Sequence, residues 1–215
     1  MRPVDRRARL HAARLYVVTG VREDLPSFLE VIVAAGVDIV QLREKDAEAR
    51  DLLRWADAFR DASERHAALF IVNDRPDVAL AAGADGVHLG QNDLPVEVAR
   101  RILGPDAIVG LSTHAPEQLD EASPAADYVT AGPVYETPTK PERAPAGLAH
   151  VRYAAAHERR PWFAIGGINE SNVSDVIAAG ATRIVVVRAV TEAPDPATAV
   201  RRLLSALGER VGGRP

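Results

Sequence analysis

Short runs of valine, isoleucine and leucine recur along the chain, and longer amphipathic stretches separate them. The apolar runs are continuous rather than alternating, which is typical of parallel strands buried on both faces. They predict strands at residues 15–18, 38–42, 69–72, 86–89, 108–111, 127–131, 162–165 and 183–187. Apolar stripes at helical spacing predict crossover helices at residues 27–35, 46–66, 96–103, 116–122, 171–179 and 197–207.

A weak internal repeat favours a barrel over an open sheet. Ala-Ala-Gly occurs at residues 34–36, 81–83 and 178–180, each time just before a predicted strand. Glycine supplies the left-handed residue that ends many helices. The repeated unit and the strand count predict an α/β fold, a single-domain (β/α)8 TIM barrel. The alternative is a doubly wound sheet, but the turn at residues 18–21 has no glycine-rich dinucleotide motif.

Length and composition agree with one enzyme domain that acts on small molecules. The chain has 215 residues and a net charge of −4, so no overall field attracts nucleic acid or a membrane surface. It contains no cysteine, which excludes disulfides and thiol catalysis and fits a cytoplasmic location. No apolar run approaches the roughly 20 residues of a membrane span. A homodimer is the expected assembly, since barrels of this size often pair.

The two ends of the chain are expected to lie outside the barrel. Residues 1–14 carry several arginines and predict a basic, poorly ordered arm, whereas residues 209–215 predict a flexible tail. The catalytic barrel is therefore expected over residues 15–208.

Polar residues follow most of the predicted strands. In a barrel, side chains just past the carboxyl ends of the strands converge on one mouth. The residues in question are Gln41-Leu42-Arg43-Glu44-Lys45, Asn73-Asp74, His88 with Asp93, Ser112, Thr137-Pro138-Thr139-Lys140, Gly166-Gly167 and Val187-Arg188. Taken singly, Asp74 and Asp93 could instead cap the helices that follow them, and His88 could be an ordinary core histidine.

Taken together, these residues favour a phosphate-handling site. Two carboxylates at adjacent strand ends would repel each other unless a cation lay between them, and oxygen ligands suit Mg²⁺. Arg43, Lys45 and Lys140 would supply the fixed positive charge that a diphosphate needs. The glycine pair after the seventh strand suits a second phosphate, bound by backbone N–H groups with a helix starting at Asn169.

The ordered motifs resemble those of the thiamine phosphate synthase family over about residues 15–192. That family removes diphosphate from 4-amino-2-methyl-5-(diphosphooxymethyl)pyrimidine, and a thiazole phosphate captures the resulting cation through its ring nitrogen. The resemblance implies a transferase of thiamine biosynthesis that uses one Mg²⁺ per subunit and releases pyrophosphate. It also implies that Arg188 stands where a serine is expected.

The resemblance also assigns roles to residues. It implies that Asp74 and Asp93 ligate the metal, and that Arg43, Lys45, Lys140 and Ser112 are catalytic. The implied pyrimidine diphosphate site comprises Gln41, Leu42, Arg43, Glu44, Lys45, Asn73, Ser112 and Lys140. The implied thiazole phosphate site comprises Thr137, Pro138, Thr139, Gly167, Val187 and Arg188.

The long irregular segment at residues 132–147 is expected to supply a lid over both substrates. Two other functions stay open from the sequence alone. A related thiazole tautomerase would not need the diphosphate residues, and His114 keeps that alternative open. A catalytically silent phosphate-binding barrel would not need the metal ligands.

Overall fold

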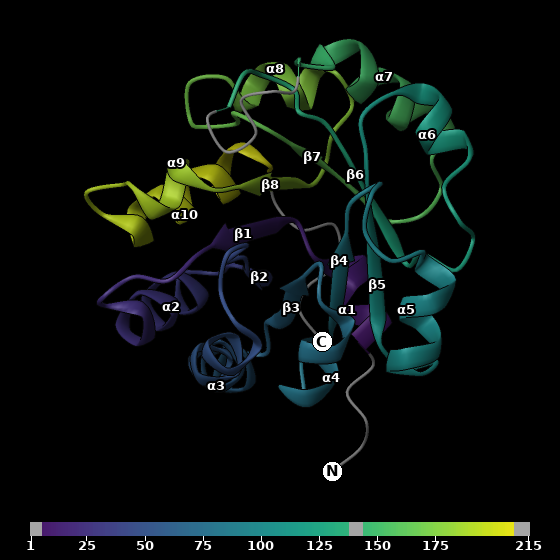
Figure 1. Ribbon diagram of the computed structural model, residues 1–215. Coiled ribbons are helices and arrows are strands. Elements are labelled where there is room, and N and C mark those ends of the chain that lie inside the picture. The colour runs from purple at the N-terminus through teal and green to yellow at the C-terminus, as the bar shows by residue number, and fades with distance from the viewer. Residues whose placement is uncertain (1–5, 138–143, 209–215) are drawn as a thin grey trace.

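The computed structural model describes residues 6–137 and 144–208, and in them eight parallel strands close into a barrel (Figure 1). The strands are β1 (Leu15–Thr19), β2 (Ile39–Leu42), β3 (Leu69–Asn73), β4 (Gly86–Leu89), β5 (Ile108–Thr113), β6 (Tyr128–Ala131), β7 (Trp162–Ile165) and β8 (Ile184–Val186). Each pairs in parallel with the next, and β8 pairs with β1. The predicted single-domain TIM barrel is confirmed.

Helices surround the barrel and connect its strands (Figure 1). In the described residues they are α1 (Arg6–Ala12), α2 (Leu25–Ala34), α3 (Ala49–His66), α4 (Pro76–Ala81), α5 (Val96–Leu103), α6 (Pro116–Asp120), α7 (Gly147–His157), α8 (Val173–Ala178), α9 (Arg188–Thr191) and α10 (Pro196–Ala206). The sequence pattern did not predict α1, α7 or α9. The buried face of α7 includes His150 beside Val151 and Ala154, so its apolar stripe is weak.

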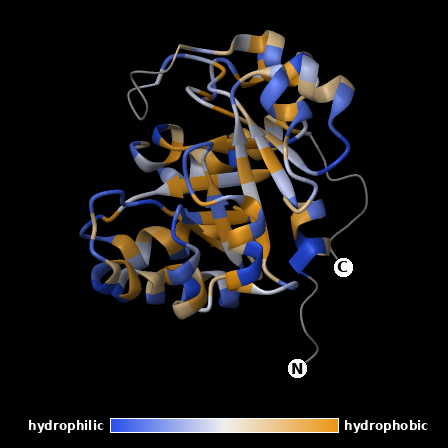
Figure 2. Cartoon of the chain, turned by 45° about the vertical axis from the view of Figure 1, so that its right-hand side comes forward, coloured by the Kyte–Doolittle hydropathy of each residue, from blue (hydrophilic) through white to orange (hydrophobic). Residues whose placement is uncertain are grey.

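Alternate residues of each strand face opposite sides of the barrel wall. Val17 and Val40 point outward into the layer between strands and helices, whereas Tyr16, Ile71 and Phe163 fill the interior. Figure 2 shows the strands as a largely hydrophobic wall, with polar positions gathered on the outer surfaces of the helices. Both faces of the wall are thus buried, which explains why the apolar runs in the sequence do not alternate.

An aspartate precedes each of β2, β4 and β6 and joins neighbouring strands at the amino-terminal end of the barrel. Asp85 Oδ2 accepts a hydrogen bond from Phe70 N on β3, at 2.9 Å. Asp127 Oδ2 accepts from Val109 N on β5, at 2.8 Å, and Asp38 Oδ2 accepts from Leu15 N on β1, at 3.1 Å. The backbones of Asp38 and Asp127 pair with the same strands, Asp38 N donating to Leu15 O and Asp127 N to Val109 O, so β2 and β6 begin within one residue of the predicted bounds.

Helix α1 covers the amino-terminal end of the barrel. Leu10 is buried within the interior cluster that contains Tyr16 and Ile71. Arg6 Nε donates to Asp85 Oδ1 at 2.8 Å, and Arg7 Nε donates to Asp127 Oδ1 at 2.9 Å. The basic segment expected to be a poorly ordered arm therefore differs over residues 6–14, because its arginines meet the aspartates at the strand starts. The expected tail at residues 209–215 lies outside the described residues.

We expect Leu10→Ala to destabilise the barrel by about 2–4 kcal/mol, because it leaves a cavity beneath the interior cluster. The free energy of unfolding in urea measures this effect. Leu80→Ala is the matched control, since Leu80 lies on α4 and is 56% exposed. Equal losses of stability in the two variants would contradict a structural role for α1.

Candidate active site

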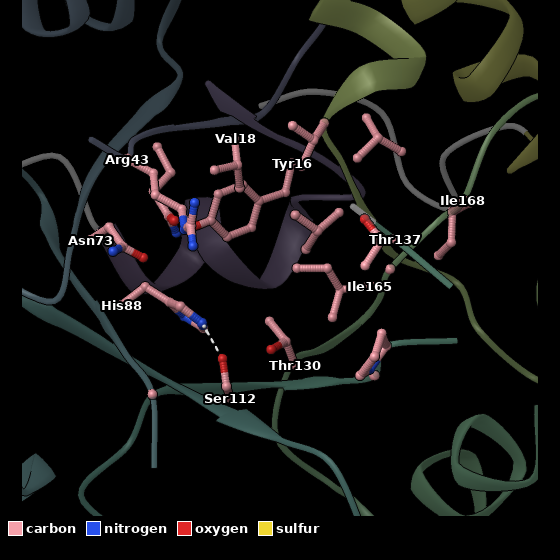
Figure 3. Close-up of a pocket in the computed structure, with 18 of the residues that line it drawn as sticks. Tyr16, Val18, Arg43, Asn73, His88, Ser112, Thr130, Thr137, Ile165 and Ile168 are labelled. Atoms are coloured by element: carbon pink, nitrogen blue, oxygen red, sulfur yellow. Dashed lines mark hydrogen bonds between the residues drawn. The ribbon is translucent and has the colours of Figure 1, made fainter. Parts of the chain in front are cut away.

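A cavity of about 580 Å³ opens at the carboxyl ends of the strands. Its volume is in the range of small-molecule sites. Every strand contributes to its lining, directly or through the loop that follows the strand. Figure 3 shows Arg43, just after β2, and Asn73, His88 and Ser112, on β3, β4 and β5, around this space. The polar residues that the sequence places at separate strand ends thus meet at one mouth.

The segment after β2 divides its side chains between the cavity and the surrounding structure. Gln41 lines the cavity from an inward position of β2, and Arg43 and Lys45 line it from the segment that follows the strand. Leu42 is not a lining residue, because it packs in the outer apolar layer. Glu44 turns away as well, and its Oε2 accepts a hydrogen bond from Val21 N at 3.2 Å.

Asp74 and Asp93 lie together at the ends of β3 and β4, and both line the cavity. Burial and the neighbouring Asp93 carboxyl raise the pKa of Asp74 to about 6, although Lys45 and Asn73 partly oppose this. The backbone of Asp74 is left-handed, with φ of 61°, and its N–H donates to His88 O at 2.8 Å. A strained backbone of this kind persists only where the surrounding structure holds it.

Neither aspartate caps the helix that follows it. The residue before α4 is Arg75 and the residue before α5 is Pro95, and neither helix has a side-chain cap. Asp93 Oδ2 instead accepts from Gly90 N at 2.6 Å within its own loop. The capping interpretation of Asp74 and Asp93 is therefore wrong, and the carboxyl pair needs another explanation.

His88 and Ser112 form the polar floor of the cavity. His88 points into the barrel, and its Nε2 lies 2.9 Å from Ser112 Oγ (Figure 3). The other ring nitrogen, Nδ1, lies 3.0 Å from the hydroxyl of Tyr128. His114 follows the end of β5 and also lines the cavity, and its Nδ1 donates to Gly132 O at 2.6 Å.

The glycine pair after β7 forms a tight turn at the opposite side of the mouth. Gly166 and Gly167 have φ of 107° and 67°, which side chains rarely adopt. A Cβ on Gly167 would lie 2.7 Å from Tyr135 Cβ, so only glycine fits there. The helix does not start at Asn169 as expected. It starts at Val173, because Asn172 Oδ1 accepts from Asn169 N at 2.9 Å and holds the intervening residues in a turn.

Arg188 begins α9 and lines the cavity beside Val187. Its side chain makes no hydrogen bond or ion pair with any residue in the described parts of the chain. Thr137 also lines the cavity, whereas Pro138, Thr139 and Lys140 lie outside the described residues. Since no described residue neutralises the Arg188 guanidinium, that charge can bind an anion.

Sequence reasoning missed two buried polar residues that line the cavity, Tyr16 and Thr130, as well as apolar residues such as Val18, Ile165 and Val185. Thr130 is 1% exposed and its Oγ1 has no hydrogen-bond partner among the described residues. Both polar residues stand at inward positions of strands, so the alternation of the barrel wall could have identified them. Their strands looked like uninterrupted core, because tyrosine and threonine are also good strand formers.

Comparison with known proteins gives a consistent family assignment. A sequence model of the family described as thiamine monophosphate synthase matches residues 15–190. The thiamine-phosphate synthase of Acidothermus cellulolyticus is 54% identical over 207 residues, which cover 94% of this chain and 98% of that protein. The thiamine-phosphate synthase of Thermobifida fusca is 54% identical, over 93% of this chain and 96% of that protein.

A solved structure agrees with these sequence matches. The thiamine phosphate pyrophosphorylase of Pyrococcus furiosus superposes with a TM-score of 0.85 and is 35% identical, covering 96% of this chain and 99% of that chain. The likeness therefore includes the whole barrel together with its mouth.

Proposed function

The chain belongs to the thiamine monophosphate synthase family, and we propose that the residues at its barrel mouth carry out the family's coupling reaction. The protein is a transferase of thiamine biosynthesis. It joins an aminopyrimidine diphosphate to a thiazole phosphate and releases pyrophosphate. The single observation that supports this assignment of residues is the meeting in one cavity of a close carboxyl pair, a polar floor, and two arginines that make no ion pair with the described residues.

The carboxyl pair fits the Mg²⁺ ion that the reaction calls for. Asp74 and Asp93 face each other closely enough to raise the pKa of Asp74, and a cation between them would remove this cost. The described residues hold no cluster of three acidic or histidine ligands, so two carboxylates would leave coordination positions to water and phosphate oxygens, as Mg²⁺ prefers. When bound, the ion would offset negative charge on the diphosphate.

Arg43 and Lys45 stand ready for the diphosphate of the pyrimidine substrate. Both line the cavity just after β2, beside the end of β3 where Asp74 lies, and the Arg43 side chain has no ion pair within the described chain. Charge builds up on the diphosphate as its bond to the methylene carbon breaks. Cations placed in advance therefore stabilise the transition state more than the bound substrate. Lys140 is proposed to add a third positive charge.

Gln41, Asn73 and Ser112 are proposed to orient the aminopyrimidine ring. They line the same part of the cavity as Arg43, and Gln41 and Ser112 are buried. The ring can delocalise the positive charge that the departing diphosphate leaves, so no protein nucleophile is required. A closed site would keep water from trapping that cation before the thiazole nitrogen attacks. The proposed lid, with Pro138 and Thr139, would serve this purpose.

Gly167, Val187, Arg188 and Thr137 are proposed to bind the thiazole phosphate. The left-handed Gly167 lets the backbone come close to a phosphate, and Arg188 can grip the same group through two N–H bonds. Leu42 and Glu44, which do not line the cavity, would contribute through their backbone or by fixing the strand end.

A coupling assay tests the proposed function. The purified protein is mixed with the pyrimidine diphosphate, the thiazole phosphate and Mg²⁺, and thiamine phosphate and pyrophosphate are followed. Products should form in equal amounts and should stop when EDTA is added. Thiazole isomerisation without coupling would instead support the tautomerase alternative, and the absence of both reactions would support a silent phosphate-binding barrel.

We expect Arg188→Ser to raise the KM for the thiazole phosphate about tenfold and to leave kcat within about twofold, because it removes a charged grip made equally in ground and transition states. Steady-state kinetics with the pyrimidine diphosphate saturating measure this effect. Arg202→Ser is the matched control, since Arg202 pairs with Glu170 on the outer surface. A KM change confined to the pyrimidine diphosphate would contradict the assignment.

None of the helices in the described residues is long and apolar enough to cross a membrane. We propose a cytoplasmic enzyme because the chain contains no cysteine. A homodimer is proposed as its assembly.

A further inference from the structure

A continuous line of hydrogen bonds runs through the floor of the cavity. Gln41 Nε2 donates to the hydroxyl of Tyr16. The hydroxyls of Tyr16 and Tyr128 lie 3.1 Å apart, and the Tyr128 hydroxyl lies 3.0 Å from His88 Nδ1. His88 Nε2 lies 2.9 Å from Ser112 Oγ. All five residues are buried, so a donor or acceptor that lost its partner in this line would stay unsatisfied, at a cost in free energy.

A glycine on β5 makes this line of bonds possible. Gly110 lies between His88 and Tyr128 in the strand register, and a Cβ there would be 2.1 Å from Tyr128 Cζ. The ring of Tyr128 therefore crosses β5 and stacks against the imidazole of His88, with ring centres 5.5 Å apart. Tyr16 and Phe163 meet the same ring edge to face and fix its position.

With Gln41 Nε2 as the donor to Tyr16, one direction of the line gives every hydrogen in it an acceptor. Burial raises the pKa of Tyr16 and of Tyr128, so both phenols keep their hydrogens. Each hydroxyl has one hydrogen to donate. Tyr16 accepts from Gln41, and Tyr128 is its other partner in the line, so the Tyr16 hydrogen goes to Tyr128 and the Tyr128 hydrogen goes to His88 Nδ1.

The direction then fixes the tautomer of the imidazole. A neutral imidazole that accepts at Nδ1 carries its hydrogen on Nε2, which donates to Ser112 Oγ. An imidazolium would donate at both nitrogens. It would turn the Tyr128 hydrogen back toward Tyr16 and leave the Tyr16 hydrogen without an acceptor in the line, which a buried site disfavours.

We propose that Tyr16, Tyr128 and His88 act as positioning residues, which turn the acceptor Oε1 of Gln41 and the hydroxyl hydrogen of Ser112 toward the same substrate. This inference rests on the proposed function, because an aminopyrimidine diphosphate complements that pair. Its exocyclic amine is a donor, and its ring nitrogens and diphosphate oxygens are acceptors. The line of bonds thereby makes Gln41 a hydrogen-bond acceptor and Ser112 a hydrogen-bond donor toward the substrate.

The tautomer of His88 tests the direction without any substrate. The protein is labelled with ¹⁵N-histidine, and correlations between ring nitrogens and ring protons identify the protonated nitrogen of each histidine. The His88→Asn variant assigns the signal by its disappearance. A hydrogen on Nε2 is the expected result. A hydrogen on Nδ1, or on both nitrogens, would overturn the proposal whether or not the protein couples the two substrates.

Tyr128→Phe tests whether the line matters for substrate binding, because it removes both central bonds and keeps the ring that fills the space over Gly110. We expect kcat/KM for the pyrimidine diphosphate to fall about tenfold, with the KM for the thiazole phosphate unchanged. The ¹⁵N signals of His88 should also shift to a mixture of tautomers. Tyr153→Phe is the matched control, since Tyr153 donates to Asp120 on the outer surface.

The outcomes separate positioning from simple support of the fold. Unchanged kinetics in Tyr128→Phe, or equal losses for both substrates, would overturn the proposal, since a loosened barrel would weaken both sites alike. If that variant does not fold, the tautomer in the unmodified protein decides. Absence of coupling in the unmodified protein would instead count against the proposed function and leave the direction of the line to the NMR result.

Discussion

Asp74→Asn and Asp93→Asn should each lower the coupling rate about 10³-fold, which corresponds to the several kcal/mol that a bound metal contributes to charge stabilisation. The carboxyl pair is the described group best suited to a divalent ion, and an amide in place of either member halves its charge. Initial rates at saturating Mg²⁺ measure the effect. Asp77→Asn is the matched control, because Asp77 pairs with Arg75 outside the cavity.

Asp74→Asn should make the metal-free protein more stable, although it lowers the coupling rate. The pKa of Asp74 is about 6 in the folded protein and 3.8 as an ordinary aspartate, so the folded state binds this proton more tightly than the unfolded state. The cost of ionising the pair is therefore absent below pH 3.8, grows between pH 3.8 and 6, and is complete above pH 6. Since Asp74 is partly exposed, solvent screening reduces this cost to about 1 kcal/mol.

Asp74→Asn in EDTA should thus melt a few degrees above the unmodified protein at pH 7, and this difference should vanish near pH 4. Mg²⁺ should raise the melting temperature of the unmodified protein and leave that of Asp74→Asn unchanged. Thermal unfolding with and without metal measures both effects. A variant that loses activity while Mg²⁺ still stabilises it would show that Asp74 acts in some way other than metal binding.

The barrel and its mouth could be predicted because both depend on local patterns. Continuous apolar runs mark strands buried on both faces, and the polar residues that end them point to one side of any parallel barrel. Arg43, Asp74 and Ser112 therefore meet as expected. Leu42 and Glu44 show the limit of a motif, since alternate residues of a strand end cannot all face one cavity.

The features that the sequence does not predict depend on contacts between residues far apart in the chain. Nothing within residues 6–14 shows that Arg6 and Arg7 meet Asp85 and Asp127, so a basic helix that closes the barrel looks like a solvated terminus. Tyr128 reaches His88 only because Gly110, on the strand between them, has no side chain. Such pairs become visible when the register of neighbouring strands is known, which a single sequence does not supply.

Arg43→Gln should lower kcat/KM for the pyrimidine diphosphate about 10²-fold, and Arg43→Lys should lower it about tenfold. The guanidinium can donate two parallel bonds to a diphosphate, each worth about 1.5–3 kcal/mol, whereas lysine keeps the charge without the fork. The Arg43 side chain has no ion pair in residues 6–137 and 144–208, so its removal leaves no carboxylate of those residues without its partner.

Stability and kinetics together therefore identify the role of Arg43. The melting temperature of Arg43→Gln should stay within about a degree of the unmodified protein, because only a solvent-facing cation is lost. Arg54→Gln is the matched control, since Arg54 pairs with Asp51 on the exposed side of α3. A loss of stability as large as the loss of activity would mean that Arg43 supports the end of β2. A fall in activity alone, larger for glutamine than for lysine, would place the guanidinium on the departing diphosphate.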